Sequence, residues 1–474
     1  GNNSSAMENP GEKRSKMWHD WFRDRIEENV PYSEMVRGVV LATSRDGRSI
    51  DRWIQDARKQ DEEALRGFDN SYARRDTLDL FWQRRNMGQE QLAEQTAAAF
   101  LGVQLQCAQC HKHPYDRWTQ ADYRAYANIF GQVKNDRSSE ARKQIDSENN
   151  RRKKTKVNKK KLPNLREVYV DHERPSRLKH PETNQPLPPT PLGAEALDEE
   201  GDYRIPFFDW LTQPENPFFA QAFVNRVWAH YMGVGIVEPV DGFSAANPPS
   251  NDKLLTALAE DFVAQNYDMR YLERQILNSQ AYQRSSLPNE SNQSDKNNYA
   301  RKYPRRMMAE VVVDVLNSAL GKNDEFTRDA PKGSSAIEVA ASRIQDSNLA
   351  YVFNAFGRPT RTAICDCERS EDPALPQILY LMTDSRIHEK IRNGRLKEEL
   401  AKDDRLAKLK KKELGDKEIG EIIDQLFLAT LTRFPEQVER QAAIANVRKQ
   451  DGSEAGLIDV FWALINTREF ILNH

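Results

Sequence analysis

Cysteine is scarce in this sequence. Only four of the 474 residues are cysteines, so a dense disulfide framework is excluded. The four form two close pairs, Cys107 with Cys110 and Cys365 with Cys367. Scattered structural cysteines are not expected to pair so tightly. We therefore expect ligands, covalent attachment points or a redox pair.

Long apolar runs are also missing. No stretch approaches the ~20 apolar residues that a membrane-spanning helix needs, so we expect no transmembrane segment. Residues 1–14 are polar and lack the apolar core of a signal peptide. Because the sequence starts without Met, we expect the natural N-terminus upstream. The missing signal is then no argument for the cytoplasm.

A strong charge of one sign is absent as well. The 70 basic and 72 acidic residues nearly cancel, so we expect no nucleic-acid partner and no attraction to a membrane surface. Residues 151–161 (RRKKTKVNKKK) are the local exception, with eight basic residues. A polyanion or acidic-lipid site is one interpretation. We favour a solvated linker, because no aromatic residues interleave the basic ones.

Signatures of common enzyme classes are likewise absent. The sequence has no GxGxxG, Walker or GxSxG motif. No Ser-His-Asp or Cys-His nucleophile arrangement can be chosen from it. Whether the protein is an enzyme is left open at this point. If it is one, we expect a bound cofactor to supply the chemistry.

Helical periodicity runs through most of the chain. Hydrophobic residues make up 38% and charged residues 30%, which fits small helical cores with broad solvated faces. Only Val168–Val170 has the character of a strand. The pattern predicts a mainly α fold with little β structure. Helices are expected over 17–26, 32–43, 89–105, 119–131, 216–233, 252–265, 269–281, 305–320, 377–392, 419–433, 436–448 and 454–471.

The composition changes after the first third of the chain. Residues 135–203 are charged and rich in Pro, with the basic run inside them. We interpret this segment as a linker or insertion that holds at most a short hairpin. The sequence therefore predicts two helical domains, 1–134 and 204–474, joined by the charged linker.

The densest chemical signal is QCAQCHKHPYDRW, which begins at Gln106. It contains the C-x-x-C-H spacing of c-type haem attachment. Two thiols three residues apart can meet the two vinyl groups of haem, and the adjacent imidazole can then ligate the iron. Cys107 and Cys110 are the candidate attachment points, and His111 is the candidate axial ligand.

A second interpretation is a zinc or iron site. The two thiols with His111 or His113 make a plausible ligand set, which Cys365 and Cys367 would complete. A C-x-C pair is too tight for easy disulfide closure, but its two thiolates can share a metal. A charged loop around two partly buried thiols is an equal alternative for that pair. A redox or structural disulfide at the C-x-x-C is the third interpretation.

Other candidate residues are weaker. His113 is better suited to a supporting role behind the ligands, held by Asp116. His230 is a candidate second axial or third metal ligand, although a satisfied core histidine is the more common case. Arg358 and Arg361 are candidate binders of a haem propionate or another anion, although surface ion pairs are more common.

Four blocks of the sequence resemble a known pair of domains. FLGVQLQCAQCHKHPYDRWTQADY resembles a planctomycete cytochrome-associated domain of unknown function. NPFFAQAFVNRVWAHYMGVGIVEPVDGFSAANPPSN resembles the start of the planctomycete-specific domain that usually follows it. GRPTRTAICDCERSEDPALPQ and IDQLFLATLTRFP resemble later blocks of that second domain. The resemblance covers the chain from about Met17 to the C-terminus, except residues 135–201.

The resemblance implies an exported protein, periplasmic or otherwise outside the cytoplasm. Such proteins often carry a separate cytochrome c-like domain upstream, and their biochemical role is undefined. Cys107, Cys110 and His111 match the C-x-x-C-H block of the first domain. Cys365 and Cys367 match a form of the second domain that carries C-x-C. We therefore expect a haem c redox or electron-transfer protein, whose partner is another redox protein or an upstream cytochrome domain. The alternative is a structural or interaction module with zinc or iron.

Overall fold

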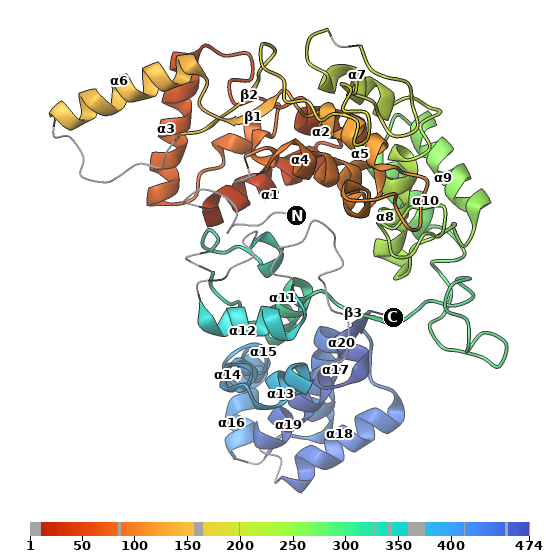
Figure 1. Ribbon diagram of the computed structural model, residues 1–474. Helices are drawn as coiled ribbons and strands as arrows, with labels where there is room; N and C mark the ends of the chain where they lie inside the picture. The colour runs from red at the N-terminus through yellow and green to blue at the C-terminus, as the bar shows by residue number, and fades with distance from the viewer. Residues whose placement is uncertain are drawn as a thin grey trace. The chain divides into compact units, whose positions relative to one another are not determined.

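The computed structural model confirms the mainly α prediction: helices hold 55% of the described residues and strands 4%. The residues that the structure describes are 11–83, 87–155, 165–198, 200–326, 329–339, 344, 346–358, 375–411, 413–450 and 454–473. They form two compact units, which are described here one by one (Figure 1). Unit 1 contains residues 11–303 and unit 2 contains the described residues from 304 to 473.

Unit 1 is a helical assembly with one small hairpin. Its core joins residues from the first helix to Tyr299 and is rich in aromatic rings. Three of these rings, Tyr126, Phe130 and Phe207, lie within 6 Å of one another, so the core is continuous between residues 126 and 207. The helices and strands are α1 (Gly11–Glu27), α2 (Tyr32–Val40), α3 (Ile50–Arg66), α4 (Gln89–Thr96), α5 (Gln120–Asn128), β1 (Val133–Asp136), α6 (Ser139–Thr155), β2 (Glu167–Val170), α7 (Arg204–Leu211), α8 (Phe219–Met232), α9 (Asp252–Ala264) and α10 (Met269–Leu277).

The boundaries of these helices follow from local chemistry. Thr119 caps α5 as predicted: its hydroxyl accepts from Asp122 N, while the Asp122 carboxylate accepts from Thr119 N. Gly233 ends α8 in the left-handed conformation, as predicted. The helix predicted over 89–105 is shorter. α4 continues as a π-turn over Ala97–Leu101 and stops at Gly102, whose φ of +67° ends the helical path.

The segment between 135 and 203 holds more structure than a linker. The predicted strand is β2, which pairs antiparallel with β1 in the register Val133↔Val170. The helix α6 was not predicted. It packs on α3 through a small separate core that includes Trp53, Ala141 and Ile145. Ala141 and Ile145 are the only apolar residues in the sequence of α6, so the sequence shows no apolar periodicity that would predict a helix.

A buried arginine at the start of α7 links that helix to the end of α2, across the segment 135–203. Arg204 is 1% exposed, and its guanidinium donates to the carbonyls of Val40 and Ala42 at 3.0 Å each. Its charge is balanced by Asp202 at 2.8 Å. Burying this charge without partners would cost several kcal/mol, so the arrangement holds α7 against the end of α2.

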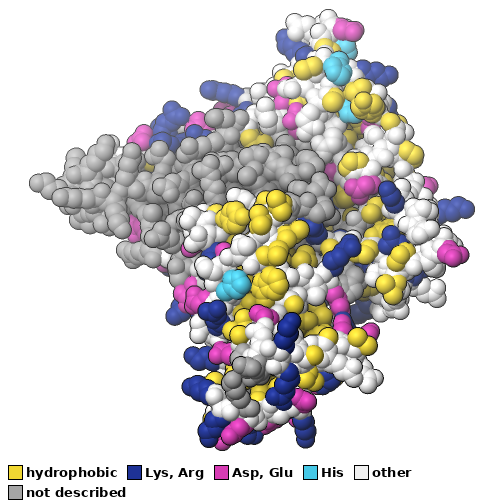
Figure 2. Space-filling model, turned by 90° about the horizontal axis from the view of Figure 1, so that it is seen from below, with side chains coloured by type: hydrophobic (Ala, Val, Ile, Leu, Met, Phe, Trp, Pro, Cys, Tyr) yellow, Lys and Arg dark blue, Asp and Glu magenta, His cyan; other side chains and the backbone are white. Residues whose placement is uncertain are grey.

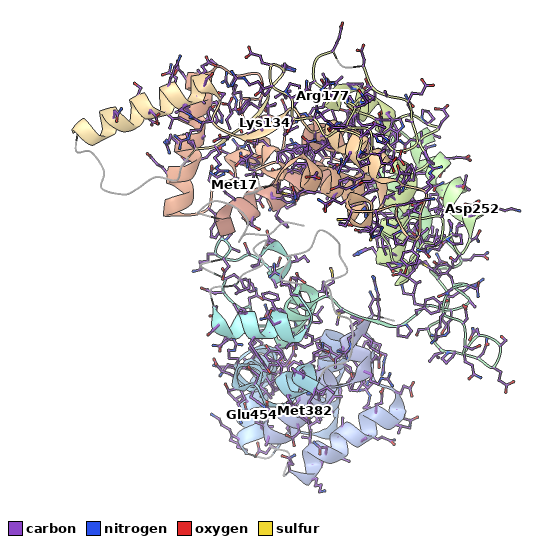
Figure 3. All side chains as sticks on the ribbon, viewed as in Figure 1. Met17, Lys134, Arg177, Asp252, Met382 and Glu454 are labelled. Atoms are coloured by element: carbon purple, nitrogen blue, oxygen red, sulfur yellow. The ribbon has the colours of Figure 1, made fainter. Side chains whose placement is uncertain are left out.

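Unit 2 is built of short helices around an aliphatic core. The buried ion pair of Glu310 with Arg358 (3.1 Å) and the partly buried pair of Asp324 with Lys390 (2.7 Å) join elements distant in the sequence. Figure 3 labels Met382, near the end of one exposed apolar helix face, and Met17, which is buried in unit 1. The elements are β3 (Arg305–Arg306), α11 (Ala309–Leu320), α12 (Ser347–Ala355), α13 (Leu375–Thr383), α14 (Ser385–Asn393), α15 (Arg395–Leu400), α16 (Arg405–Lys410), α17 (Asp416–Leu431), α18 (Gln437–Lys449), α19 (Glu454–Ile465), α20 (Arg468–Ile471) and β4 (Leu472–Asn473).

The charge pattern and the helix lengths also agree with expectation. Basic and acidic side chains are interspersed over the described surface in Figure 2, and neither sign dominates that face. Within the described residues, no helix combines the length and the apolar character that a bilayer crossing requires.

Candidate functional site

The C-x-x-C-H motif lies on a short turn at the surface of unit 1. Residues Gln106–Gln109 form one turn of 3₁₀ helix. Ala108 points into the core and is fully buried, which turns its neighbours outward. The side-chain amide of Gln120, at the start of α5, donates to the Gln109 carbonyl at 2.7 Å and holds the turn in place. The motif is therefore fixed by one buried alanine and one tether.

Both thiols of the motif are accessible. Cys107 and Cys110 are free and exposed. The disulfide interpretation of this pair is not the state that the structure shows. Two reduced thiols on one turn are available for covalent attachment or for metal binding.

The backbone selects a tautomer for His111. Its Nδ1 lies 2.7 Å from the Lys112 carbonyl oxygen, which can only accept, so Nδ1 carries the proton. The other nitrogen, Nε2, then has a free lone pair in the neutral ring. A histidine that donates one N–H to a backbone carbonyl and offers its other nitrogen is the usual arrangement of a metal ligand.

His113 has the opposite arrangement. Its Nδ1 accepts from Tyr115 N at 3.3 Å, so in the neutral ring the proton lies on Nε2. His113 is thus set up as a hydrogen-bond donor and His111 as a ligand, although they lie two residues apart. Asp116 accepts from Arg117 N at 2.7 Å, and its side chain lies beside His113 in the wall of a cavity.

That cavity has a volume of about 330 Å³ and lies next to the motif. One wall comes from the segment after the cysteines, and the other comes from the loop that follows α8. Two main-chain hydrogen bonds join the walls: Phe243 N donates to the Gly102 carbonyl at 3.0 Å, and Ala246 N donates to the Tyr115 carbonyl at 3.2 Å. The lining residues are Gln104, His113, Tyr115, Asp116, Pro239, Gly242, Phe243, Ser244, Ala246 and Asn247.

A buried acid and a buried phenol lie behind the motif, and sequence reasoning missed them. The Tyr123 hydroxyl donates to Glu94 Oε1 at 2.8 Å, and Tyr123 is fully buried. Burial raises the pKa of Glu94, against the lowering effect of this hydrogen bond. Burial and the hydrogen bond to Glu94 raise the pKa of Tyr123. The sequence carries little signal for this pair, because Glu94 is one of two glutamates in a helix that also holds three glutamines.

The other predicted site residues lie elsewhere or outside the described residues. His230 is exposed on α8, with its ring edge-on to Tyr231. Arg358 lies in unit 2, where its ion pair with Glu310 and its hydrogen bond to the Val339 carbonyl give it a structural role. Arg361, Cys365 and Cys367 lie outside the described residues. Within the part of the chain that the structure describes, no group of three or more His, Cys, Asp or Glu side chains could hold a metal ion.

Comparison with known families agrees with the resemblance found in the sequence. A family model described as PSCyt2, protein of unknown function (DUF1549), matches residues 2–135. A second, described as PSD1, protein of unknown function (DUF1553), matches residues 203–447 and so covers more than half of the chain. No curated protein and no solved structure matches it. The chain therefore belongs to the PSD1 family, and it carries the planctomycete cytochrome-associated domain ahead of the planctomycete-specific domain.

Proposed function

We propose that this protein carries a covalently attached haem c on Cys107 and Cys110, with His111 as an axial ligand, and serves electron transfer. The observation that supports this most is the tautomer of His111. Its Nδ1–H is held by the Lys112 carbonyl, and its Nε2 is the nitrogen offered outward. The two thiols are free and exposed on the same turn, as thioether formation requires.

The donor set fits haem c in number, spacing and protonation. Two thiols and one imidazole lie within five consecutive residues. A bound haem would supply one-electron chemistry, while the chain's own residues attach it and orient it. The cavity wall beside the motif contains Tyr115 and Phe243, so apolar surface lies near the attachment points.

The exposed position of the motif favours exchange of electrons with a partner. A haem held there would have an edge near the surface, where a redox protein or an upstream cytochrome domain can approach. The proposal includes an exported location, periplasmic or similar, because covalent haem attachment is consistent with an exported bacterial protein and relatives with these domains are exported.

A zinc or iron site is the second candidate. The two free, exposed thiols of Cys107 and Cys110 are the ligands from which such a site would be built. Such a site would need a further ligand, for which Cys365 and Cys367 are the candidates in the sequence. The metal would then have a structural or interaction role.

The visible spectrum separates the two proposals. The full chain is produced in bacteria that export it and attach haem c, and the spectrum is recorded together with zinc and iron content. We expect a Soret band that is lost when Cys107 and Cys110 are both replaced by Ser. His111→Ala is expected to shift the band and weaken axial ligation, whereas His113→Ala is expected to leave it unchanged. A colourless protein with stoichiometric zinc would refute haem attachment and support the second candidate.

A further inference from the structure

The cavity beside the motif is pre-formed by its own hydrogen bonds. Asn247 uses both N–H groups of its amide within the loop, donating to the carbonyls of Gly242 at 2.9 Å and Glu238 at 3.2 Å. Asn225 on α8 donates to the carbonyls of Val237 and Val240 and holds the base of the loop. A loop fixed in this way loses little conformational entropy when a ligand binds.

The cavity offers both donors and acceptors. His113 presents Nε2–H, as its tautomer requires, while Asn247 keeps its amide oxygen as an acceptor. The side chains of Gln104 and Ser244 also line the cavity and make no hydrogen bond to any described residue. Asp116 adds a carboxylate. A ligand in the cavity would therefore meet groups of both kinds at short range.

The lining disfavours an anion. No lysine or arginine is among the lining residues, and Asp116 contributes a carboxylate. An organic cation would use the carboxylate and the aromatic rings, but its charged group offers no acceptor to the N–H of His113 or the hydroxyl of Ser244. A hydroxyl group both donates and accepts, so a ligand with several hydroxyls matches the mixed lining best.

Two aromatic rings add an apolar face. Tyr115 is 68% exposed, although a large aromatic ring at a surface normally covers part of itself. Phe243 forms part of the opposite wall, on the loop after α8. Aromatic rings beside amide and carboxylate groups suit a molecule with one apolar and one hydroxylated face, as a sugar ring has. The volume lies at the lower end of ligand pockets, which run from about 300 to 1,000 Å³, and suits one or two rings.

We propose that this cavity binds a neutral sugar of one or two rings, with Tyr115 against its apolar face and with Asp116, His113 and Asn247 at its hydroxyls. The site is built jointly by residues of the two matched family regions, 2–135 and 203–447. This explains why the loop after α8 is pinned to the segment after the cysteines. The proposal does not rest on haem, since none of the cavity residues is an attachment point.

The test is saturation-transfer NMR on the full chain, followed by titration. The panel contains the methyl glycosides of glucose, galactose, mannose, xylose and N-acetylglucosamine, disaccharides of these sugars, and choline as an organic cation. We expect saturation of at least one sugar and none of choline. Tyr115→Ala is expected to weaken binding of that sugar about tenfold, whereas Tyr115→Phe keeps the ring and the affinity. Asp116→Asn is expected to weaken binding as well.

The matched control is Tyr351→Ala, which removes a tyrosine that is 50% exposed in unit 2 and should leave sugar binding unchanged. Circular dichroism verifies that each variant is folded. The proposal is overturned if no sugar of the panel is saturated. It is also overturned if the Tyr115→Ala and Asp116→Asn variants bind the sugar as tightly as the unchanged protein does. Saturation of choline alone, lost in Asp116→Asn, would identify a cation site instead.

Discussion

Unit 1 and unit 2 are both helical, but they differ in their cores and in their loops. The core of unit 1 is rich in aromatic rings, and long connections around it carry the cysteine motif and the cavity. The core of unit 2 is mostly Leu, Ile and Val between short turns. The two family regions meet inside unit 1, since residues 203–303 share one core with residues 17–133. The boundary between the two family regions, at residues 135–203, therefore differs from the boundary between the two folding units, which lies after residue 303.

The largest effect is expected from truncation within unit 1. A chain ending at residue 202 loses α7–α10 and with them Phe207, Phe219 and Phe262, each at most 1% exposed. Losing a single such ring costs about 3–5 kcal/mol, so losing all three exceeds the stability of most domains. We expect no cooperative thermal transition by circular dichroism. A chain of residues 304–474 is the comparison and is expected to melt cooperatively. A cooperative transition of 1–202 would contradict the single core.

The second prediction concerns a buried carboxylate of unit 1. Asp79 is 1% exposed and accepts from Ser44, Tyr72 and Gln83, with Arg75 at 3.0 Å. Asp79→Asn leaves the Arg75 charge buried without its partner. We expect a loss of about 3–5 kcal/mol in the free energy of unfolding of unit 1, measured by urea denaturation. The control is Asp403→Asn in unit 2, where the side chain is 82% exposed and little change is expected.

The same carboxylate gives the pH dependence of unit 1 its sign. Burial would raise the pKa of Asp79, but the charge of Arg75 and the hydrogen bonds lower it below its ordinary value. The unfolded chain therefore binds the proton more tightly, and the stabilisation is present above the unfolded pKa. It is lost as the pH falls through that value and then through the folded pKa. In Asp79→Asn this acid-induced loss is expected to shrink. If the variant loses as much stability at low pH as the unchanged protein does, Asp79 is not the source of the pH dependence.

The third prediction tests the joint between the motif and the cavity loop. Gly102 has a φ of +67°, and a Cβ there would lie 2.7 Å from Phe243 Cδ2. Gly102→Ala is expected to cost about 1–3 kcal/mol from overpacking in addition to backbone strain. Gly201→Ala, at φ +73° with nothing within 4 Å, carries the strain alone. Equal losses in the two variants, measured by thermal denaturation, would show that the Phe243 contact is of no consequence.

The smallest expected effect is in unit 2. Arg433 binds both Glu439 and Glu469 at 2.7 Å, and about a third of each side chain is exposed. Hydrogen bonding to Arg433 lowers the pKa of Glu439 to about 2. Its stabilisation is present above the unfolded pKa and lost as the pH falls toward 2. Because solvent screens the pair, Glu439→Gln should cost only about 0.5–1 kcal/mol at neutral pH and less in high salt. A loss as large as that of Asp79→Asn would remove the contrast between the units.

The sequence predicted the parts of the fold that depend on local chemistry. The Thr119 cap, the Gly233 stop and the strand at 168–170 follow from residues within a few positions of each element. The helix α6 was not predicted, because it contacts α3 through only two apolar residues, Ala141 and Ile145, which are too few to show a helical periodicity. The segment 89–105 was predicted too long, because the helix ends at Gly102, whose carbonyl accepts a hydrogen bond from Phe243 N, far along the chain.

The candidate site also has features that local sequence predicts and features that depend on the fold. The motif itself was evident from spacing, since Cys107, Cys110 and His111 lie within five residues. The tautomers of His111 and His113 depend on the backbone groups that face each ring, and no residue pattern specifies these. The cavity joins residues near 104–116 to residues near 239–247, which are more than a hundred positions apart. Only the folded core of unit 1 brings them together.

The most direct test of the central proposal is the mass of the intact chain under denaturing conditions. The protein is exported in a host that attaches haem c and is then unfolded in acid before mass spectrometry. We predict a mass gain of one haem that survives denaturation and is absent when Cys107 and Cys110 are replaced by Ser. An unmodified mass for the unreplaced chain, in a host where a control cytochrome c gains its haem, would contradict it.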